Sequence, residues 1–455
     1  MTFALNPLRR RPPGRAGFPV APGAWPVIGH LPTLALDSLE LMRRAERELG
    51  PLFWVEQGFG HHVLYCLDPA GFEIMRNRAT SSSVLTAVVG EFLGDSMIVH
   101  DGARHQHIRS AMGGPFTPRG LTALELGPVF AATIRERVAR WRDVGEVQIL
   151  AETRELAIEL MFRMMGIRER DLSTWREHYE TYVLLAWNMP IELPGFPRWR
   201  GRRAKAWLDA QLLARIRAAR EHDGEPGLLR ELVHARDDGG LQLGDSELID
   251  NLRFLLLAGH ETSATVMAWM VIELARRPDL WARLREEAAA GDVPVTPKEL
   301  RGFPFAEAIF RESSRLHPPT SMDARIVTGE LELLGRQIPA GAMVGVSLAH
   351  LSRHPALFAD GDAFVPERWL DRKQPLSPLE LAQFGGGPHF CLGYHLAWME
   401  IVQFAVALAH AMNDAGLRPA PCGPPPRTHY LPLAHPAPGT RVRFVRTLGA
   451  TDRGP

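Results

Sequence analysis

Cysteine is scarce in this sequence, and neither sign of charge is in excess. Cys66, Cys391 and Cys422 are the three cysteines among 455 residues, and their odd number and wide spacing exclude a disulfide framework and suit a reducing compartment. The 52 basic and 52 acidic residues leave no formal net charge, so no overall field attracts nucleic acid or an anionic membrane. We therefore expect a cytoplasmic protein that does not bind nucleic acid.

The N-terminal segment lacks a long hydrophobic run. Residues 1–31, MTFALNPLRRRPPGRAGFPVAPGAWPVIGHL, contain no apolar core of signal-peptide length, nor the ~20 apolar residues that span a bilayer. The segment is rich in Pro and Arg. We interpret residues 1–21 as an extended lead-in that joins the body near Trp25, with a solvated tail favoured over a contact at a membrane surface. No membrane anchor is expected.

Hydrophobic residues are abundant, at 45% with 11 Trp and 20 Phe, and their spacing is mostly helical. Short alternating runs that indicate strands occur in three regions: a hairpin at 51–68, then 325–348 and 428–446. Apolar residues three and four apart predict helices at 37–48, 120–141, 150–166, 204–221, 246–275 and 278–290. The pattern indicates a mainly α body with small β-sheets.

The longest predicted helix covers 246–277, with Asp245 as its N-cap and Pro278 after its end. About 30 residues at ~1.5 Å each would cross a whole domain. The helix is apolar nearly all round, which indicates burial. Charged and polar residues interrupt it too often for a membrane span: Arg253, His260 and Glu261.

A glycine-rich loop, FGGGPHFCLG at 384–393, stands before a helix predicted to begin near Leu392. Cys391 therefore lies beside a helix N-terminus, whose free N–H groups lower a thiol's pKa. The glycines let the backbone approach a flat ligand without Cβ clashes. By itself, such a cysteine is compatible with core packing, a catalytic nucleophile or a zinc ligand. Zinc is disfavoured because partners at short spacing are absent.

Phe384, Gly387, His389, Cys391 and Gly393 form Phe-x-x-Gly-x-His-x-Cys-x-Gly. This pattern resembles the heme-binding loop of the cytochrome P-450 family, in which the position of His389 is most often Arg. The resemblance implies heme b, with Cys391 as the axial ligand of the iron. It also places three loop residues beside the cofactor: Phe384, Gly385 and Gly393.

Other family motifs follow in order. Glu312 and Arg315, in FRESSRLHPP, resemble the Glu-x-x-Arg pair of the family's K helix, and three-residue spacing puts them on one helix face. Alone, the pair is equally typical of a surface ion pair. Arg368, in FVPERWLD, resembles the arginine of the Pro-Glu-Arg-Phe segment, with Trp369 at the aromatic position. The resemblance implies a structural triad that braces the heme-binding loop.

Cations for the heme propionates come from separate parts of the chain. His105 and Arg109 stand four apart in a segment that resembles the family's C helix. Arg325 matches the arginine that opens a strand after the K helix, and His389 belongs to the loop. Arg and His both bind carboxylates by hydrogen bonds. The alternative for His105 and Arg109 is a solvated helix face.

The long helix contains Ala258, Gly259, His260, Glu261 and Thr262, similar to the family's Ala-Gly-x-(Asp/Glu)-Thr motif for oxygen activation. A mid-helix glycine costs ~1 kcal/mol, and the resemblance suggests that Gly259 leaves room for O2 and water. It implies that Thr262 assists oxygen activation and that Glu261 relays protons from solvent. The alternative is that Thr262 bonds back to a carbonyl one turn earlier.

The resemblance covers nearly the whole chain. It implies one heme domain at 22–446, shaped as a triangular prism, with a C-terminal tail at 447–455. It implies a monooxygenase that inserts one oxygen atom from O2 into a hydrophobic substrate by hydroxylation or epoxidation, with electrons from NAD(P)H through a separate ferredoxin or flavodoxin-type donor. The alternatives are a peroxygenase or isomerase that needs no external electrons, and a non-catalytic heme-binding sensor.

Two surfaces are predicted by position. The substrate pocket is mostly apolar, which favours a terpenoid, steroid, fatty acid or polyketide; its predicted lining is Phe254, Leu257, Ala258, Ser321, Met322, Val84 and Leu85. Positive charge near Cys391 would receive an acidic electron donor, and the residues predicted to supply it are Arg104, Arg353, Arg372 and Lys373.

Overall fold

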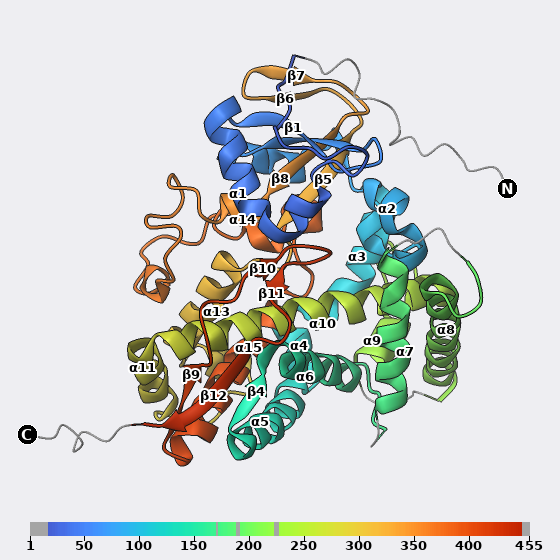
Figure 1. Cartoon of the computed structure of the whole chain (residues 1–455). Coiled ribbons are helices and arrows are strands. Elements are labelled where there is room, and N and C mark those ends of the chain that lie inside the picture. The colour runs from blue at the N-terminus through green and yellow to red at the C-terminus, as the bar shows by residue number, and fades with distance from the viewer. Residues whose placement is uncertain (1–16, 170–171, 188–191, 223–226, 448–455) are drawn as a thin grey trace, which may run out of the picture.

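The computed structural model describes residues 17–447 except 170–171, 188–191 and 223–226. A small sheet region lies at one end, and helices make up most of the rest (Figure 1). The prediction of a mainly α protein with small sheets is therefore confirmed. The predicted lead-in residues 1–16 and most of the predicted tail, residues 448–455, lie outside the described residues.

The largest sheet has the strand order β1-β2-β8-β5-β3. β1 and β2 form the predicted hairpin, in which Leu52 pairs with Cys66. β8 pairs with β2 in parallel and with β5 in antiparallel orientation. The strands are β1 (Leu52–Glu56), β2 (His62–Cys66), β3 (Thr80–Ser81), β5 (Met322–Val327) and β8 (Met343–Ser347).

The chain joins this sheet earlier than the sequence predicted. Phe18 is 4% exposed and lies in a hydrophobic cluster with residues of β1 and β2. Val20 bridges to Trp54 of β1. Trp25, by contrast, is 60% exposed. The body therefore begins by Phe18, because backbone pairing with β1 orders the residues that precede Trp25.

The remaining strands form three further small sheets. A three-stranded sheet has the order β4-β12-β9, and β6-β7 and β10-β11 are two-stranded. The sequence predicted the region of β12 but not its partner β9, whose prolines are atypical of a strand. The bounds are β4 (Glu146–Gln148), β6 (Leu331–Leu333), β7 (Arg336–Ile338), β9 (Leu417–Pro421), β10 (Thr428–His429), β11 (His435–Pro436) and β12 (Arg441–Arg446).

The helices enclose the main hydrophobic core. The α-helices are α1 (Leu31–Leu49), α2 (Val84–Leu93), α3 (Gly102–Gly113), α4 (Pro118–Ala123), α5 (Leu126–Val144), α6 (Ile149–Met164), α7 (Ser173–Val183), α8 (Pro197–His222), α9 (Leu228–His234), α10 (Asp245–Arg276), α11 (Pro278–Ala288), α12 (Pro297–Leu300), α13 (Pro304–Leu316), α14 (Leu348–Leu351) and α15 (Tyr394–Asp414). Short 3-10 helices are η3 (Pro69–Met75), η4 (Met97–Val99), η5 (Gly114–Phe116), η6 (Leu184–Trp187), η7 (Pro366–Trp369), η8 (Ala382–Phe384) and η9 (Gly387–His389).

Two helix predictions were wrong in detail. The predicted helix 120–141 is divided, because Glu125 has a φ of 51° between α4 and α5 and a left-handed residue interrupts a helix. Asp245 is not the N-cap of the long helix. Gly244 takes that position, and its backbone N–H donates to the Glu247 carboxylate at 2.7 Å.

α10 runs through the middle of the molecule (Figure 1). By length and composition alone, two helical segments of the described chain could cross a membrane: Asp245–Arg276 and Gly387–Asp414. In the folded chain, 72% of the first apolar window and 61% of the second are buried. Arg253 of α10 is 1% exposed and ion-pairs with Asp209 and Asp250. The apolar surface of α10 is therefore covered by other parts of this chain.

Candidate functional site

The loop 384–393 folds back on itself before α15. The Cys391 N–H donates to the Phe384 carbonyl at 2.7 Å, which brings the two ends of the loop together. Gly385 has a φ of +85°, and a Cβ there would lie 2.7 Å from the His389 carbonyl oxygen. The tight turn therefore requires glycine at this position. At Gly393, in contrast, a Cβ would meet no protein atom within 4 Å, so protein packing does not explain that glycine.

Burial raises the pKa of the Cys391 thiol, opposed by a hydrogen bond from the Gly393 N–H and by the charge of Arg109. The predicted lowering by N–H groups at the helix start is present in the Gly393 hydrogen bond, but desolvation of the thiolate outweighs both favourable contacts. Without a bound metal ion, the Cys391 thiol therefore favours its neutral form. A bound metal ion would deprotonate it, as metals do with coordinating thiols.

Three of the four predicted propionate-binding residues lie close to the loop, and the charge of Arg109 acts on the Cys391 thiol. The rings of His105 and His389 lie 4.2 Å apart between centroids, and His389 Nε2 is 3.1 Å from Asp101 Oδ1. Arg325 is 4% exposed and its guanidinium contacts the Asp323 carboxylate at 3.0 Å. Three distant chain segments therefore supply buried or half-buried cations and imidazoles, the groups that bind carboxylates.

Burial sets the charge state of His105, and hydrogen bonds set that of Asp101. It lowers the pKa of His105 to about 4, with further lowering from His389 and Arg109, so His105 is neutral near pH 7. Burial alone would raise the pKa of Asp101, but hydrogen bonds from His389 and Ser81 hold it well below its usual range. Asp101 is therefore ionised beside His389. The sequence did not single out Asp101 or Asp323.

One face of α10 is half-buried, although the rest of this stretch is buried. Phe254, Leu257, Ala258, Glu261 and Thr262 are partly accessible, and their spacing of three and four places them on one side of the helix. A partly accessible face in the middle of a protein indicates internal space beside it. The predicted pocket residues of α10, Phe254, Leu257 and Ala258, therefore lie together on this face.

Gly259 has a packing role that the sequence did not predict. A Cβ at this position would lie 2.3 Å from Met161 Sδ of α6. A side chain at position 259 would therefore require the flexible end of Met161 to move. Contact with α6 is thus one reason for this glycine, and the predicted room for O2 and water stays a prediction.

Thr262 and Glu261 have partners inside the protein. Thr262 Oγ1 donates to the Ala258 carbonyl one turn earlier, the alternative that the sequence left open. The Glu261 carboxylate is ion-paired with Arg154 of α6, at 2.9 Å. Arg154 lies far from Glu261 in the sequence, and no motif pointed to it.

Glu400 of α15 is a buried acid that the sequence analysis missed. It is 2% exposed, and Ser263 Oγ, next to Thr262 on α10, donates to its carboxyl at 3.2 Å. Burial raises the pKa of Glu400 from 4.5 to about 8, while the Ser263 hydrogen bond lowers it. Glu400 is thus mainly neutral at pH 7. It contacts Ser263, the residue that follows Thr262 in the chain.

Glu400 is expected to make folding pH-dependent. The folded chain keeps a proton that the unfolded chain releases between pH 4.5 and about 8. The stability from this group is therefore full below the lower value and is lost as pH rises through the upper one. The free energy of unfolding in urea, measured at about pH 5 and at about pH 8, should fall with rising pH. The fall should be smaller for Glu400→Gln than for the unaltered protein. Equal losses would contradict the assigned protonation.

The predicted triad is present, with Glu312 and Arg315 fully buried and Arg368 half-buried. Arg315 Nε and Nη2 donate to the Glu312 carboxylate, both at 2.8 Å, and Arg368 Nε donates to it at 3.1 Å. Trp369 Nε1 donates to the same carboxylate at 2.8 Å, so the tryptophan that replaces the family's aromatic residue adds a hydrogen bond. Arg315 also donates to three carbonyls of the following segment: Ser352, Gly361 and Ala363. The triad therefore fixes residues 352–369.

Two predicted pocket residues point elsewhere. Met322 Sδ accepts hydrogen bonds from Ser38 and Tyr65. Its strand β5 alternates, so Met322 faces α1 while Asp323 and Arg325 lie on the opposite face. Val84 is 3% exposed and belongs to the same cluster under α1. Both predictions were wrong, because strand alternation and core packing decide the direction of these side chains.

The remaining pocket candidates differ in burial. Phe254 and Leu257 pack against the main core, and Leu85 lies between that core and the cluster under α1. Ser321 is 4% exposed, and its carbonyl accepts from the Ala349 N–H at 3.0 Å. These four residues and Ala258 stay predictions for the substrate pocket.

The predicted docking cations are mostly engaged. The Arg353 side chain is 11% exposed, ion-pairs with Asp362 and donates to the Ala349 carbonyl at 2.8 Å. Its prediction as a docking residue was wrong, because it holds the protein's own backbone. Arg104 ion-pairs with Asp95 and Glu247, and Arg372 with Glu380, but both keep partly exposed side chains. Lys373 is exposed.

These residues fit a heme group. A sulfur stands beside a glycine that protein packing does not require, Arg and His side chains from three segments suit two carboxylates, and a half-buried apolar face of α10 is available to a hydrophobic ring system. The donor is a single thiolate, because no second cysteine lies nearby in the sequence and Cys391 belongs to no group of three possible metal ligands among the described residues. Such a site suits iron in a macrocycle, and not tetrahedral zinc.

Comparison with known proteins identifies the family. The family model for cytochrome P-450 matches residues 19–410, and the chain belongs to this family. It is therefore a monooxygenase that binds heme b. The chain is 44% identical to a cytochrome P-450 BJ-4 homolog from Sinorhizobium fredii, over 98% of this chain and 100% of the relative. It is equally identical, over the same shares, to cytochrome P-450 BJ-4 from Bradyrhizobium diazoefficiens.

More distant relatives share the fold. A cyclooctat-9-en-7-ol 5-monooxygenase from Streptomyces melanosporofaciens is 27% identical, over 88% of this chain and 90% of the relative. The solved structure of retinoic acid-bound cyanobacterial CYP120A1 has a TM-score of 0.81 and 24% identity, covering 94% of this chain and 100% of that one. The predicted cytochrome P-450 fold is thus confirmed.

Proposed function

We propose that this monooxygenase hydroxylates or epoxidises a hydrophobic small molecule of the terpenoid, steroid, fatty acid or polyketide class. The half-buried face of α10 carries this proposal, because Phe254, Leu257 and Ala258 offer apolar contacts where a substrate would lie. The named activity of the Streptomyces relative, on cyclooctat-9-en-7-ol, and the retinoic acid in the cyanobacterial structure are consistent with an apolar substrate.

Cys391 would bind the iron, and the cation cluster of His105, Arg109, Arg325 and His389 would hold the propionates. When bound, heme supplies the oxygen chemistry, for which a thiolate ligand favours O–O cleavage. The apolar side chains of α10 would orient the substrate and exclude water. Ser321 and Leu85 would also lie next to the substrate.

Thr262 would act as a hydrogen-bond acceptor. Its hydroxyl proton is engaged by the Ala258 carbonyl, so only the two lone pairs of Oγ1 remain for a water molecule or the reacting group. Glu261 is held by Arg154 and would pass protons from the surface only when this ion pair opens. The threonine therefore positions a proton, while the acid supplies one.

Thr262→Ala should uncouple electron use from product formation. NADH consumption should continue, while product per electron falls by about a hundredfold, the lower end of the range for lost proton-transfer groups. The measurement compares NADH, peroxide and product for a substrate found by ligand-induced shifts of the Soret band. Thr262→Ser, which keeps the hydroxyl, is the control and should stay coupled. Full coupling in Thr262→Ala would refute the assigned role.

We infer that electrons from NAD(P)H reach the site through a separate ferredoxin or flavodoxin-type donor, and that the protein works in the cytoplasm. Arg104, Arg372 and Lys373 are the docking cations that the proposal retains. The paired acid and threonine at 261–262 favour this route over a peroxygenase, an isomerase or a heme sensor. NADH-dependent product formation that requires an added ferredoxin would distinguish these functions.

A further inference from the structure

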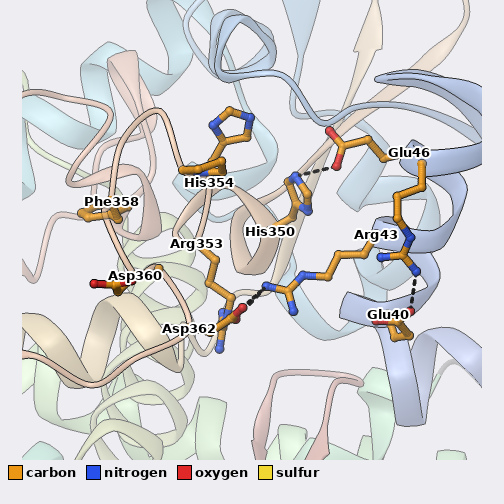
Figure 2. Close-up of a pocket in the computed structure, with 12 residues that line it drawn as sticks. Glu40, Arg43, Glu46, His350, Arg353, His354, Phe358, Asp360 and Asp362 are labelled. Atoms are coloured by element: carbon orange, nitrogen blue, oxygen red, sulfur yellow. Dashed lines mark hydrogen bonds and ion pairs between the residues drawn. The ribbon is translucent and has the colours of Figure 1, made fainter.

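A polar pocket lies between α1 and the segment that follows β8 (Figure 2). Its volume is about 530 Å³, and its lining includes Glu46, His350 and His354. Figure 2 shows the His350 ring directed at the Glu46 carboxylate, with His354 beside it. None of these residues belongs to the Cys391 loop, the cation cluster or α10.

His350 is the unusual member of this group. The residue is 6% exposed, yet neither ring nitrogen has a hydrogen-bond partner. Nε2 lies 3.3 Å from Glu46 Oε2, in a geometry that is not a hydrogen bond. Burying a polar group without a partner costs about 1–3 kcal/mol, so this ring calls for a ligand. Burial lowers the pKa of His350 to about 4, which keeps the lone pair that a metal needs.

The geometry suits a tetrahedral metal ion. Ligand atoms about 2.1 Å from zinc, at tetrahedral angles, stand ~3.4 Å apart, close to the 3.3 Å between Glu46 and His350. A nitrogen of His354 completes a set whose ligand atoms all lie within 4.8 Å of one another. Binding would therefore require only a short inward movement of the His354 ring.

Two features oppose a cation here. The charges of Arg43 and Arg353 lie near the site, although both guanidiniums ion-pair with Asp362. His354 Nδ1 accepts a hydrogen bond from the Ala356 N–H at 3.2 Å, which coordination by His354 would weaken or break. The affinity should therefore be lower than that of structural zinc sites with four protein ligands.

We propose that Glu46, His350 and His354 bind a divalent transition-metal ion, with zinc as the preferred ion, and that the ion fastens α1 to the segment after β8. Imidazole and carboxylate are ligands that zinc accepts in proteins. Three protein ligands leave a fourth position for water from the pocket. The site is separate from the heme iron and takes a different metal.

The test uses the heme-loaded full chain after removal of loosely bound metal with a chelator. Zinc chloride is titrated in competition with a chromophoric chelator. We expect one zinc ion per chain, and Glu46→Gln and His354→Ala should each weaken binding about tenfold or more, as expected for the loss of a metal ligand. Both variants change partly exposed residues, which avoids the cavity that His350→Ala would create in the core.

His62→Ala is the matched control, because His62 and Glu56 form a comparable His–Glu pair, with Nε2 3.5 Å from Oε1, outside the proposed site. This variant should bind zinc as the unaltered protein does. All variants should keep their ferrous carbon monoxide spectrum, since none touches the heme site. Anomalous diffraction at the zinc edge should place the ion between the three residues. Unchanged affinity in Glu46→Gln and His354→Ala, or a zinc peak elsewhere, would overturn the proposal.

Discussion

Replacing Cys391 with serine should abolish monooxygenase activity, the largest effect expected from any single substitution. Serine is similar in size, but a neutral hydroxyl donates far less electron density to iron than a thiolate does. We expect the ferrous carbon monoxide complex to lose its long-wavelength Soret band. Turnover should fall at least about a thousandfold, equivalent to ~4 kcal/mol of activation free energy. The measurements are the carbon monoxide difference spectrum and product formation.

Cys422→Ser is the matched control. Cys422 is exposed and free, so its substitution removes a thiol without changing the loop. It should keep both the spectrum and the activity. A Cys391→Ser protein that retained the long-wavelength band would show that another residue ligates the iron, and the assignment of the whole site would fail.

Glu312→Ala should cause the largest loss of stability. The substitution leaves Arg315, with no exposed surface, as a buried charge without its carboxylate. Arg368, the Trp369 indole and the Val365 N–H lose an acceptor at the same time. Breaking a buried ion pair by removing one partner costs about 3–5 kcal/mol. Urea unfolding of the heme-loaded protein measures this loss, and heme release should accompany it.

Glu367→Ala provides the comparison. Glu367 ion-pairs with Arg283, and both side chains are 46% exposed. Solvent screens such a pair, so we expect a loss of about 0–1 kcal/mol. If Glu312→Ala cost no more than Glu367→Ala, the buried triad would not brace the segment 352–369, and its proposed role would be wrong.

Motifs carried by short spacing were predicted well. Glu312 and Arg315 lie one helical turn apart, so their contact follows from helix geometry once the helix is recognised. The hairpin of β1 and β2 follows from alternation and glycines in the same way. For the loop at 384–393, the close turn at Gly385 also depends on atoms only a few residues away.

Side-chain direction was predicted less well. Met322 was placed in the substrate pocket by its position after the helix α13, but strand alternation turns it towards Tyr65. Arg353 was taken for a surface cation, yet it is held by Asp362 and backbone carbonyls. Each error arose because the neighbouring elements, which no local pattern specifies, determine which face of a segment is buried.

The sequence by itself determined the family, the order of its motifs and the helical character of the chain, and it predicted the thiolate ligand, because these depend on residue types at short, fixed spacings. Only the tertiary structure decided that Arg154 pairs with Glu261, that Met161 packs against Gly259, and that Glu400 is buried beside Ser263. Desolvation and contact between distant elements arise only when the helices pack, and they set both the charge states and the partners of the site.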